Sequence, residues 1–158
     1  MTRSKSTVLL LAVLMCGCSA TTLNSVFANA GTNSVQLLPE GGISEQQAQR
    51  ACSIIDQIAQ EDGFARDSKA EELSRSLSEA DRLPGYIILH SYSDSQRKIF
   101  LNASYSPARS FVVGVNDGTR MSNSNMVRRL EREVAQKLSD AFGKDKVRVE
   151  RQQYFDFT

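Results

Sequence analysis

The sequence predicts an α+β fold, a two-layer sandwich in which two main helices cover one face of a four-stranded, mainly antiparallel sheet. Three observations predict it. Apolar residues recur with the helical period over 44–62 and again over 124–142. Between these segments, three short stretches alternate apolar and polar residues, as half-buried strands do. A fourth alternating stretch follows the second helical segment.

The first helix is predicted in SEQQAQRACSIIDQIAQED, over 44–62. Ser44 and Gln47 have the spacing of a capping box, in which each side chain bonds the backbone N–H of the other residue. Ile43 precedes the cap, where a hydrophobic staple begins, and Gly63 ends the helix. The apolar stripe comprises Ala48, Cys52, Ile55, Ile58 and Ala59.

A weaker helix is predicted over 68–83. Ser68 and Glu71 repeat the capping spacing, and Pro84 stops the helix. Because its apolar stripe is thin, we expect a helix that is mostly exposed. The stripe comprises Leu73, Leu77 and Ala80.

Three consecutive antiparallel strands are predicted in YIILHSYS (86–93), KIFLNASY (98–105) and RSFVVGVN (109–116), because turn residues join them. Alternation places seven apolar residues on the face that the helices cover: Ile99, Leu101, Ala103, Tyr105, Phe111, Val113 and Val115. The opposite face would then carry His90, Tyr92, Phe100 and Val112. That face is a candidate contact surface unless the weak helix covers it.

The second main helix begins at Ser124 and ends at Gly143. Its stripe comprises Met126, Val127, Leu130, Val134, Leu138, Ala141 and Phe142. A last strand follows in KVRVERQQYFDF (146–157). A further short strand in SVQLL (34–38) would bring the order close to a ferredoxin-like topology, a fold that hosts many unrelated functions.

The first residues have the three-part order of a secretory signal. Arg3 and Lys5 precede an apolar run over 8–15, and small residues follow. The run is too short to span a bilayer, which takes about 20 apolar residues. It ends in Met15-Cys16-Gly17-Cys18, and this stretch resembles the lipobox of bacterial lipoproteins.

The resemblance implies cleavage between Gly17 and Cys18 and acylation of Cys18, so that membrane lipid is one partner of the chain. Ser19, which follows the lipidated cysteine, implies the outer membrane, with the domain facing the periplasm. We therefore divide the chain into a signal peptide (1–17), a lipidated cysteine with a flexible tether (18–34) and one α+β domain (35–158). The polar tether has a reach of about 20–25 Å. The alternative is an ordinary signal peptide that releases a soluble protein.

Charge and cysteine content limit the function classes. Without residues 1–17, 17 Lys and Arg stand against 18 Asp and Glu, a formal charge of −1, so we expect no nucleic-acid binding. Cys52 is the only cysteine left besides Cys18, and a domain with one free thiol is not built on disulfides. Because Cys52 lies on the apolar stripe of the first helix, we expect a small buried group.

The residues indicate no catalytic set. His90 is the only histidine, and strand alternation sends Ser91 and Ser93 to the face opposite it. No acidic cluster has the spacing of metal ligands, and we expect no metal and no cofactor. The loop 117–129 contains Gly118 before a helix but matches no phosphate-binding motif.

Charge is distributed unevenly along the chain. Residues 40–94 hold eleven Asp and Glu against five Lys and Arg, and residues 95–151 hold six against twelve. Either the two halves neutralise each other in the fold, or the second half presents a basic interaction surface. That surface would comprise Arg128, Arg129, Arg132, Lys144, Lys146, Arg148 and Arg151.

Together these observations predict a non-enzymatic, lipid-anchored module that binds another envelope protein or assembly. Two alternatives remain open. One is a small periplasmic enzyme or ligand-binding protein that uses His90 or the 117–129 loop. The other is direct contact of the basic half with lipopolysaccharide or cell wall. The oligomeric state is left open.

Overall fold

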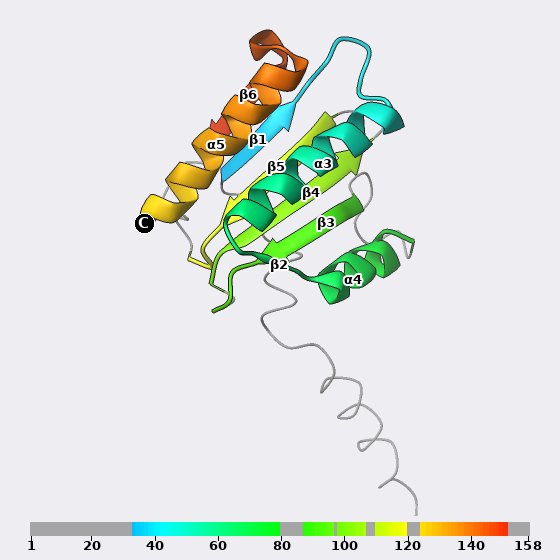
Figure 1. The fold of residues 1–158 in the computed structure, drawn as a ribbon. Coiled ribbons are helices and arrows are strands. Elements are labelled where there is room, and N and C mark those ends of the chain that lie inside the picture. The colour runs from blue at the N-terminus through cyan, green and yellow to red at the C-terminus, as the bar shows by residue number, and fades with distance from the viewer. Residues whose placement is uncertain (1–32, 80–86, 97, 107–109, 120–123, 152–158) are drawn as a thin grey trace, which may run out of the picture.

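A computed structural model describes residues 33–79, 87–96, 98–106, 110–119 and 124–151. Within them the chain forms one six-stranded antiparallel sheet and three α-helices (Figure 1). The strand order is β2-β3-β4-β5-β1-β6. The strands are β1 (Asn33–Leu37), β2 (Ala65–Arg66), β3 (Ile87–Ser93), β4 (Phe100–Ser106), β5 (Ser110–Asn116) and β6 (Val147–Arg151). The helices are α3 (Glu45–Glu61), α4 (Ser68–Glu79) and α5 (Asn125–Phe142), and a 3₁₀ turn, η2 (Lys144–Lys146), precedes β6.

The α+β class is confirmed, but the prediction of four strands and two helices is wrong in detail. β1 is the short strand anticipated in SVQLL, and it includes Asn33 and Ser34, the end of the predicted tether. β2 was not predicted, because two residues are too few to show an alternating pattern. The three predicted strands between α4 and α5 are present. A βαββαβ arrangement has only two strands between its helices, so the order departs from the ferredoxin-like topology that the sequence was expected to approach.

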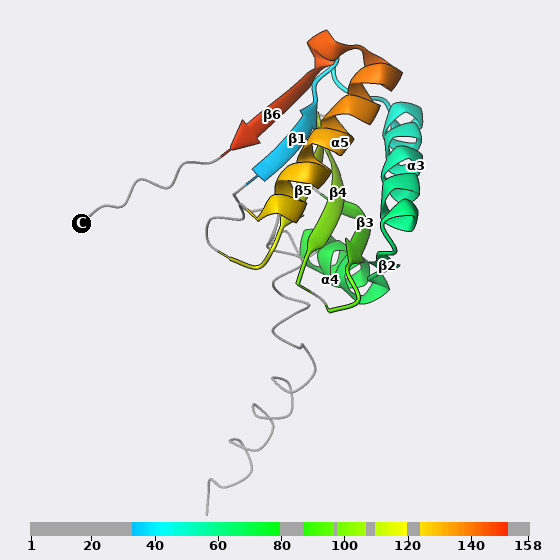
Figure 2. The same ribbon diagram turned by 60° about the vertical axis from the view of Figure 1, so that its left-hand side comes forward.

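α3 and α5 lie side by side over one face of the sheet (Figures 1 and 2). The predicted capping box is present, with the Ser44 hydroxyl accepting from the Gln47 N–H and the Gln47 side chain accepting from the Ser44 N–H. The two helices bury their stripes against the inner face of the strands. That core comprises Val35, Leu37, Ala48, Cys52, Ile55, Ile58, Ala59, Leu101, Ala103, Phe111, Val113, Val115, Val127, Leu130, Val134 and Leu138.

A shift of register in β3 changes which side chains face the core. Ile88 pairs with Ser104, whereas His90 pairs with Ala103, so Leu89 is an extra residue in the ladder. The extra residue moves His90 and Tyr92 onto the face covered by α3. The prediction that these two residues lie on the opposite face is therefore wrong. Phe100, which does lie on the opposite face, is buried rather than exposed.

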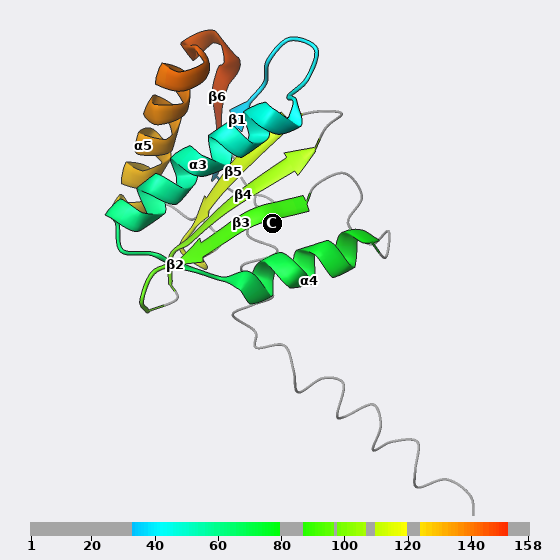
Figure 3. The ribbon, with the colours of Figure 1, turned by 45° about the vertical axis from the view of Figure 1, so that its right-hand side comes forward.

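α4 lies alongside β3 at one end of the sheet (Figure 3). Its N-terminus is capped by Asp67 rather than Ser68, because the Asp67 carboxylate accepts from the Ala70 N–H at 3.2 Å. Glu71 bonds to the sheet rather than completing the predicted capping box, because its Oε1 accepts from the backbone N–H of Ser91 in β3 at 2.9 Å. The Arg66 guanidinium donates to both oxygens of Glu71. α4 and β2 thus cover the edge of β3.

α5 begins at a turn built by Asp117. The Asp117 carboxylate accepts from the backbone N–H groups of Thr119 and Ser124, and the Ser124 hydroxyl then caps Val127. Gly143, with φ of 103°, ends the helix in a conformation that favours glycine. None of the helices among the described residues combines the length and apolarity needed to cross a membrane.

Candidate functional site

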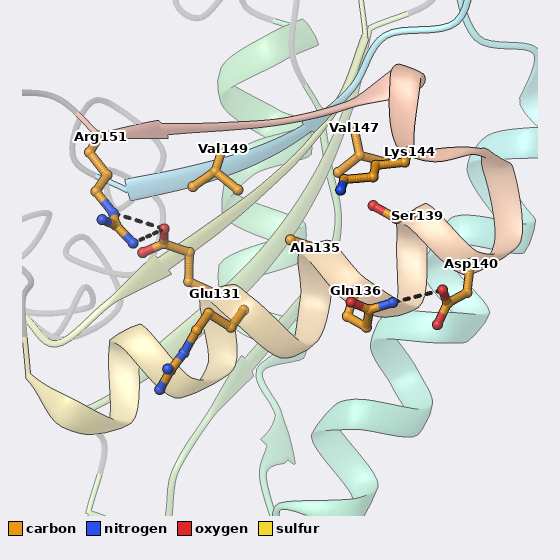
Figure 4. A pocket seen from close by; sticks show the side chains of 10 residues that line it. Glu131, Ala135, Gln136, Ser139, Asp140, Lys144, Val147, Val149 and Arg151 are labelled. Carbon is orange, nitrogen blue, oxygen red and sulfur yellow. Dashed lines mark hydrogen bonds and ion pairs between the residues drawn. The ribbon is translucent and has the colours of Figure 1, made fainter.

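A groove of about 840 Å³ runs between α5 and β6 (Figure 4). Its apolar lining comes from Ala135 of α5 and from Val147 and Val149 of β6, and Val149 is 41% exposed. The apolar lining is short, so specificity would come from the polar groups around it. The charged lining includes Arg132, Lys144, Arg151, Glu131 and Asp140.

One end of the groove is held by an ion pair between Glu131 of α5 and Arg151 of β6. Arg151 Nε and Nη2 each lie 2.9 Å from Glu131 Oε1. The Glu131 side chain is only 1% exposed, whereas that of Arg151 is 60% exposed. The second oxygen, Oε2, is buried and accepts no hydrogen bond among the described residues. The ion pair connects β6 to α5. A buried carboxylate oxygen without a donor is unfavourable for folding, so it offsets part of the stability that this contact provides.

The predicted basic surface is divided by the fold. Arg132, Lys144 and Arg151 line the groove. Arg129 instead turns toward α3, where its Nη2 lies 2.7 Å from Asp62 Oδ1.

Arg148 alternates with the groove-facing valines of β6 and therefore lies on the other face of the sheet. The remaining members, Arg128 and Lys146, are not part of the groove lining.

Two ion pairs between α3 and α5 account for part of the uneven charge distribution. Besides Arg129 and Asp62, Lys137 Nζ lies 2.6 Å from Glu61 Oε2. The hydrogen bond between them lowers the pKa of Glu61 and raises the pKa of Lys137. The acidic first half and the basic second half therefore meet across the two helices. Arg129 and Glu61 are exposed, whereas Asp62 and Lys137 are half-buried, so each pair is partly screened by solvent and contributes only modestly to stability.

A second polar cluster joins α3 to β3. His90 Nδ1 lies 2.5 Å from Asp56 Oδ1, and the Tyr92 hydroxyl donates to the same oxygen. An ionised carboxylate can only accept, so with Asp56 ionised this contact requires the His90 proton on Nδ1. Burial raises the pKa of Tyr92, and the hydrogen bond to Asp56 raises it further. Asp56 lies 34 residues from His90 in the chain, and the bulge that brings the two together has no sequence signal, so Asp56 was not among the predicted site residues.

Cys52 lies one helical turn before Asp56 and is buried, as predicted. Burial, together with the nearby Asp56 charge, raises the pKa of the Cys52 thiol to about 12. The group is therefore a thiol rather than a nucleophilic thiolate at neutral pH. In the part of the chain that the structure describes, no three His, Cys, Asp or Glu side chains are placed to hold a metal ion.

The predicted N-terminal sites lie outside the described residues. These are the cleavage site at Gly17 and Cys18, the lipidation site at Cys18, and the tether up to residue 32. The loop 117–129 is described in part, and there Asp117 is engaged in the turn before α5. Comparisons of the chain with protein-family models, with curated proteins and with solved structures found no match.

Proposed function

We propose that the chain is a bacterial lipoprotein, anchored in the outer membrane by acylated Cys18, whose domain binds another component of the cell envelope and catalyses no reaction. The anchor is supported by the charged start, the short apolar run and the Gly17-Cys18 pair. Two or more acyl chains hold a protein durably, because each buried methylene contributes about 0.8 kcal/mol. A partner in the same membrane is then met at high effective concentration.

The observation that carries the binding role is the groove between α5 and β6. It combines exposed Val149 with the cationic side chains of Arg132 and Lys144 on a face of the molecule that no described segment covers. Exposed apolar groups rimmed by polar ones are typical of protein-binding sites. A protein segment with apolar and acidic side chains fits this lining, because it complements both the valines and the cations.

The chemistry of the buried groups favours binding over catalysis. A nucleophile needs a lowered pKa or an adjacent base, and burial holds the Cys52 thiol in its protonated form. The Tyr92 hydroxyl already donates to Asp56. Asp56 therefore joins side chains within the fold, and the described residues place no activated nucleophile beside His90.

Crosslinking in intact cells tests the binding role. A photoreactive amino acid at Gln136, which is exposed and lines the groove, is compared with the same amino acid at Arg75, which is exposed on α4 near the other end of the sheet. We expect a different protein to be crosslinked at Gln136 and not at Arg75. Equal yields at the two positions, or none at either, would contradict the proposal.

The anchor is tested separately. We expect mass spectrometry of the mature chain to find Cys18 as the first residue, carrying acyl chains. The Cys18→Ala chain should leave the membrane fraction. Recovery of an unmodified mature chain that starts elsewhere would overturn the lipoprotein assignment. It would not affect the binding role proposed for the groove.

A second candidate is a ligand-binding or enzymatic role for His90, supported by its 2.5 Å contact with Asp56. A deletion strain complemented with His90→Gln distinguishes the two roles. If His90 acts on a ligand, the His90→Gln variant will fail to complement the deletion at normal protein levels, whereas the Gln136→Arg variant will complement it. The binding role through the groove predicts the reverse.

A further inference from the structure

β6 is the last strand in the sheet order, and the described residues place no strand on its outer side. Its inner side pairs with β1 over five residues, from Asn33 opposite Arg151 to Leu37 opposite Val147. An edge strand with free backbone groups is a template for another strand. The exposed Val149 at its centre makes this edge still more suited to pairing.

The hydrogen bonding of β1 shows which residues of β6 offer backbone groups outward. The Leu38 N–H donates to the Lys146 carbonyl at 2.8 Å, one residue beyond the last pair of the ladder. Because hydrogen-bonded pairs alternate along an antiparallel ladder, Arg148 and Glu150 bond to β1. Val149 and Arg151 therefore turn both their N–H and C=O groups away from β1. The Val147 carbonyl does the same, whereas the Val147 N–H donates to the Lys144 carbonyl of the 3₁₀ turn.

The side chains of β6 complement one another when the strand meets itself. In an antiparallel pair centred on Val149, Arg148 lies opposite Glu150 of the second copy, and the same pair recurs on the other side of the centre. Opposite charges across a strand pair are favourable and like charges are not. A pair centred on Arg148 sets that arginine against itself, and one centred on Glu150 does the same for the carboxylate. Of these three registers, the one centred on Val149 avoids like charges.

We infer that two copies of this chain associate through β6, in an antiparallel pair with its two-fold axis at Val149. The outward groups of Val149 and Arg151 and the Val147 carbonyl then form about four backbone hydrogen bonds. The two sheets become one, and the interface is isologous and closes after two copies. This inference does not rest on the proposed function, since neither lipid nor an envelope partner enters it.

The pairing would also change the groove. Val147 and Val149 face α5 in each copy (Figure 4), so the joined strands bring four valines into one apolar strip. The strip lies between the two α5 helices and is bordered by Arg132 and Lys144 of each copy. A dimer thus offers one longer groove where each monomer offers a short one.

Disulfide trapping in cells that express the full chain tests the register. At a hydrogen-bonded pair the two Cα atoms lie about 5.5 Å apart, which a disulfide can bridge. We expect Val149→Cys to give a covalent dimer under mild oxidation, well above the wild-type chain with its natural cysteines. Arg75→Cys, exposed on α4, is the matched control. Equal dimer yields for the two variants, or a disulfide to a different protein in place of the dimer, would overturn the inference.

Charge reversal tests the same pairing without new cysteines. Sedimentation equilibrium of the full chain in mild detergent should show a reversible dimer. Arg148→Glu and Glu150→Arg should each weaken it about tenfold or more, because each sets like charges opposite one another twice. The double variant restores opposite charges and should return to within about threefold of wild type. A monomer at all concentrations, or a double variant as weak as the singles, would refute the pairing, and circular dichroism checks that each variant is folded.

Discussion

Glu131 of α5 and Arg151 of β6 form an ion pair in which two nitrogens of the guanidinium reach the same oxygen, Oε1, at 2.9 Å. The carboxylate is buried and the guanidinium is mostly exposed, so the pair connects the core side of α5 to the edge of the sheet. The ion pair fixes one end of the groove. The second oxygen of Glu131, Oε2, has no donor among the described residues.

Removal of Arg151 should be more harmful than removal of the whole pair. Arg151→Ala leaves a buried carboxylate without its cation, and we expect a loss of about 1–3 kcal/mol in the free energy of unfolding, moderated by the exposure of Arg151. Glu131→Leu combined with Arg151→Ala replaces the charge with apolar volume and should cost less. Urea denaturation measures both. A double variant less stable than Arg151→Ala would contradict this account of Glu131.

The capping box at the start of α3 should contribute measurably to stability. Ser44→Ala removes the acceptor for the Gln47 N–H, and we expect a loss of about 1 kcal/mol. Ser53→Ala, in the exposed middle of the same helix, is the matched control. Because alanine is the better helix former, that change should be neutral or slightly stabilising. Thermal denaturation measures both variants against the wild-type chain. Equal decreases in the two midpoints of unfolding would disprove the prediction.

The Asp117 turn should make stability depend on pH in the acid range. Burial alone would raise the pKa of Asp117, but hydrogen bonds from Thr119 and Ser124 outweigh it and hold the pKa below its ordinary value of 3.8. The unfolded chain therefore takes up the proton first as the pH falls. The contribution is complete above pH 3.8 and is lost as the pH falls through the lower folded value. Asp117→Asn should flatten this part of the stability profile, measured by denaturation from pH 2 to pH 6. An unchanged profile would exclude Asp117 as its source.

Cys52 should resist alkylation in the folded protein. A pKa raised from 9.0 to about 12 lowers the thiolate fraction at pH 8 about a thousandfold, and burial limits access as well. We expect modification of the Cys52 peptide, followed by mass spectrometry, to be slow in buffer and fast in denaturant. Rapid labelling in buffer would mean that α3 opens readily or that the thiol is accessible.

The elements that the sequence alone determined are those set by local patterns. The period and caps of 45–61 and 125–142 define α3 and α5, because a helix is specified by residues three and four positions apart. The alternation of Leu101 with Ala103, and of Phe111 with Val113, likewise assigned the inner faces of β4 and β5. The lipobox resemblance depends on four consecutive residues and stays a prediction.

Only the tertiary structure decided which distant segments meet. The extra residue at Leu89 turned His90 toward Asp56, and no local pattern announces a bulge. The placement of β1 between β5 and β6 made β6 an edge strand, and it aligned Arg151 with Glu131. Such contacts depend on the closure of long loops and on the register between strands that are far apart in the chain. Side-chain periodicity within one segment carries no information about either.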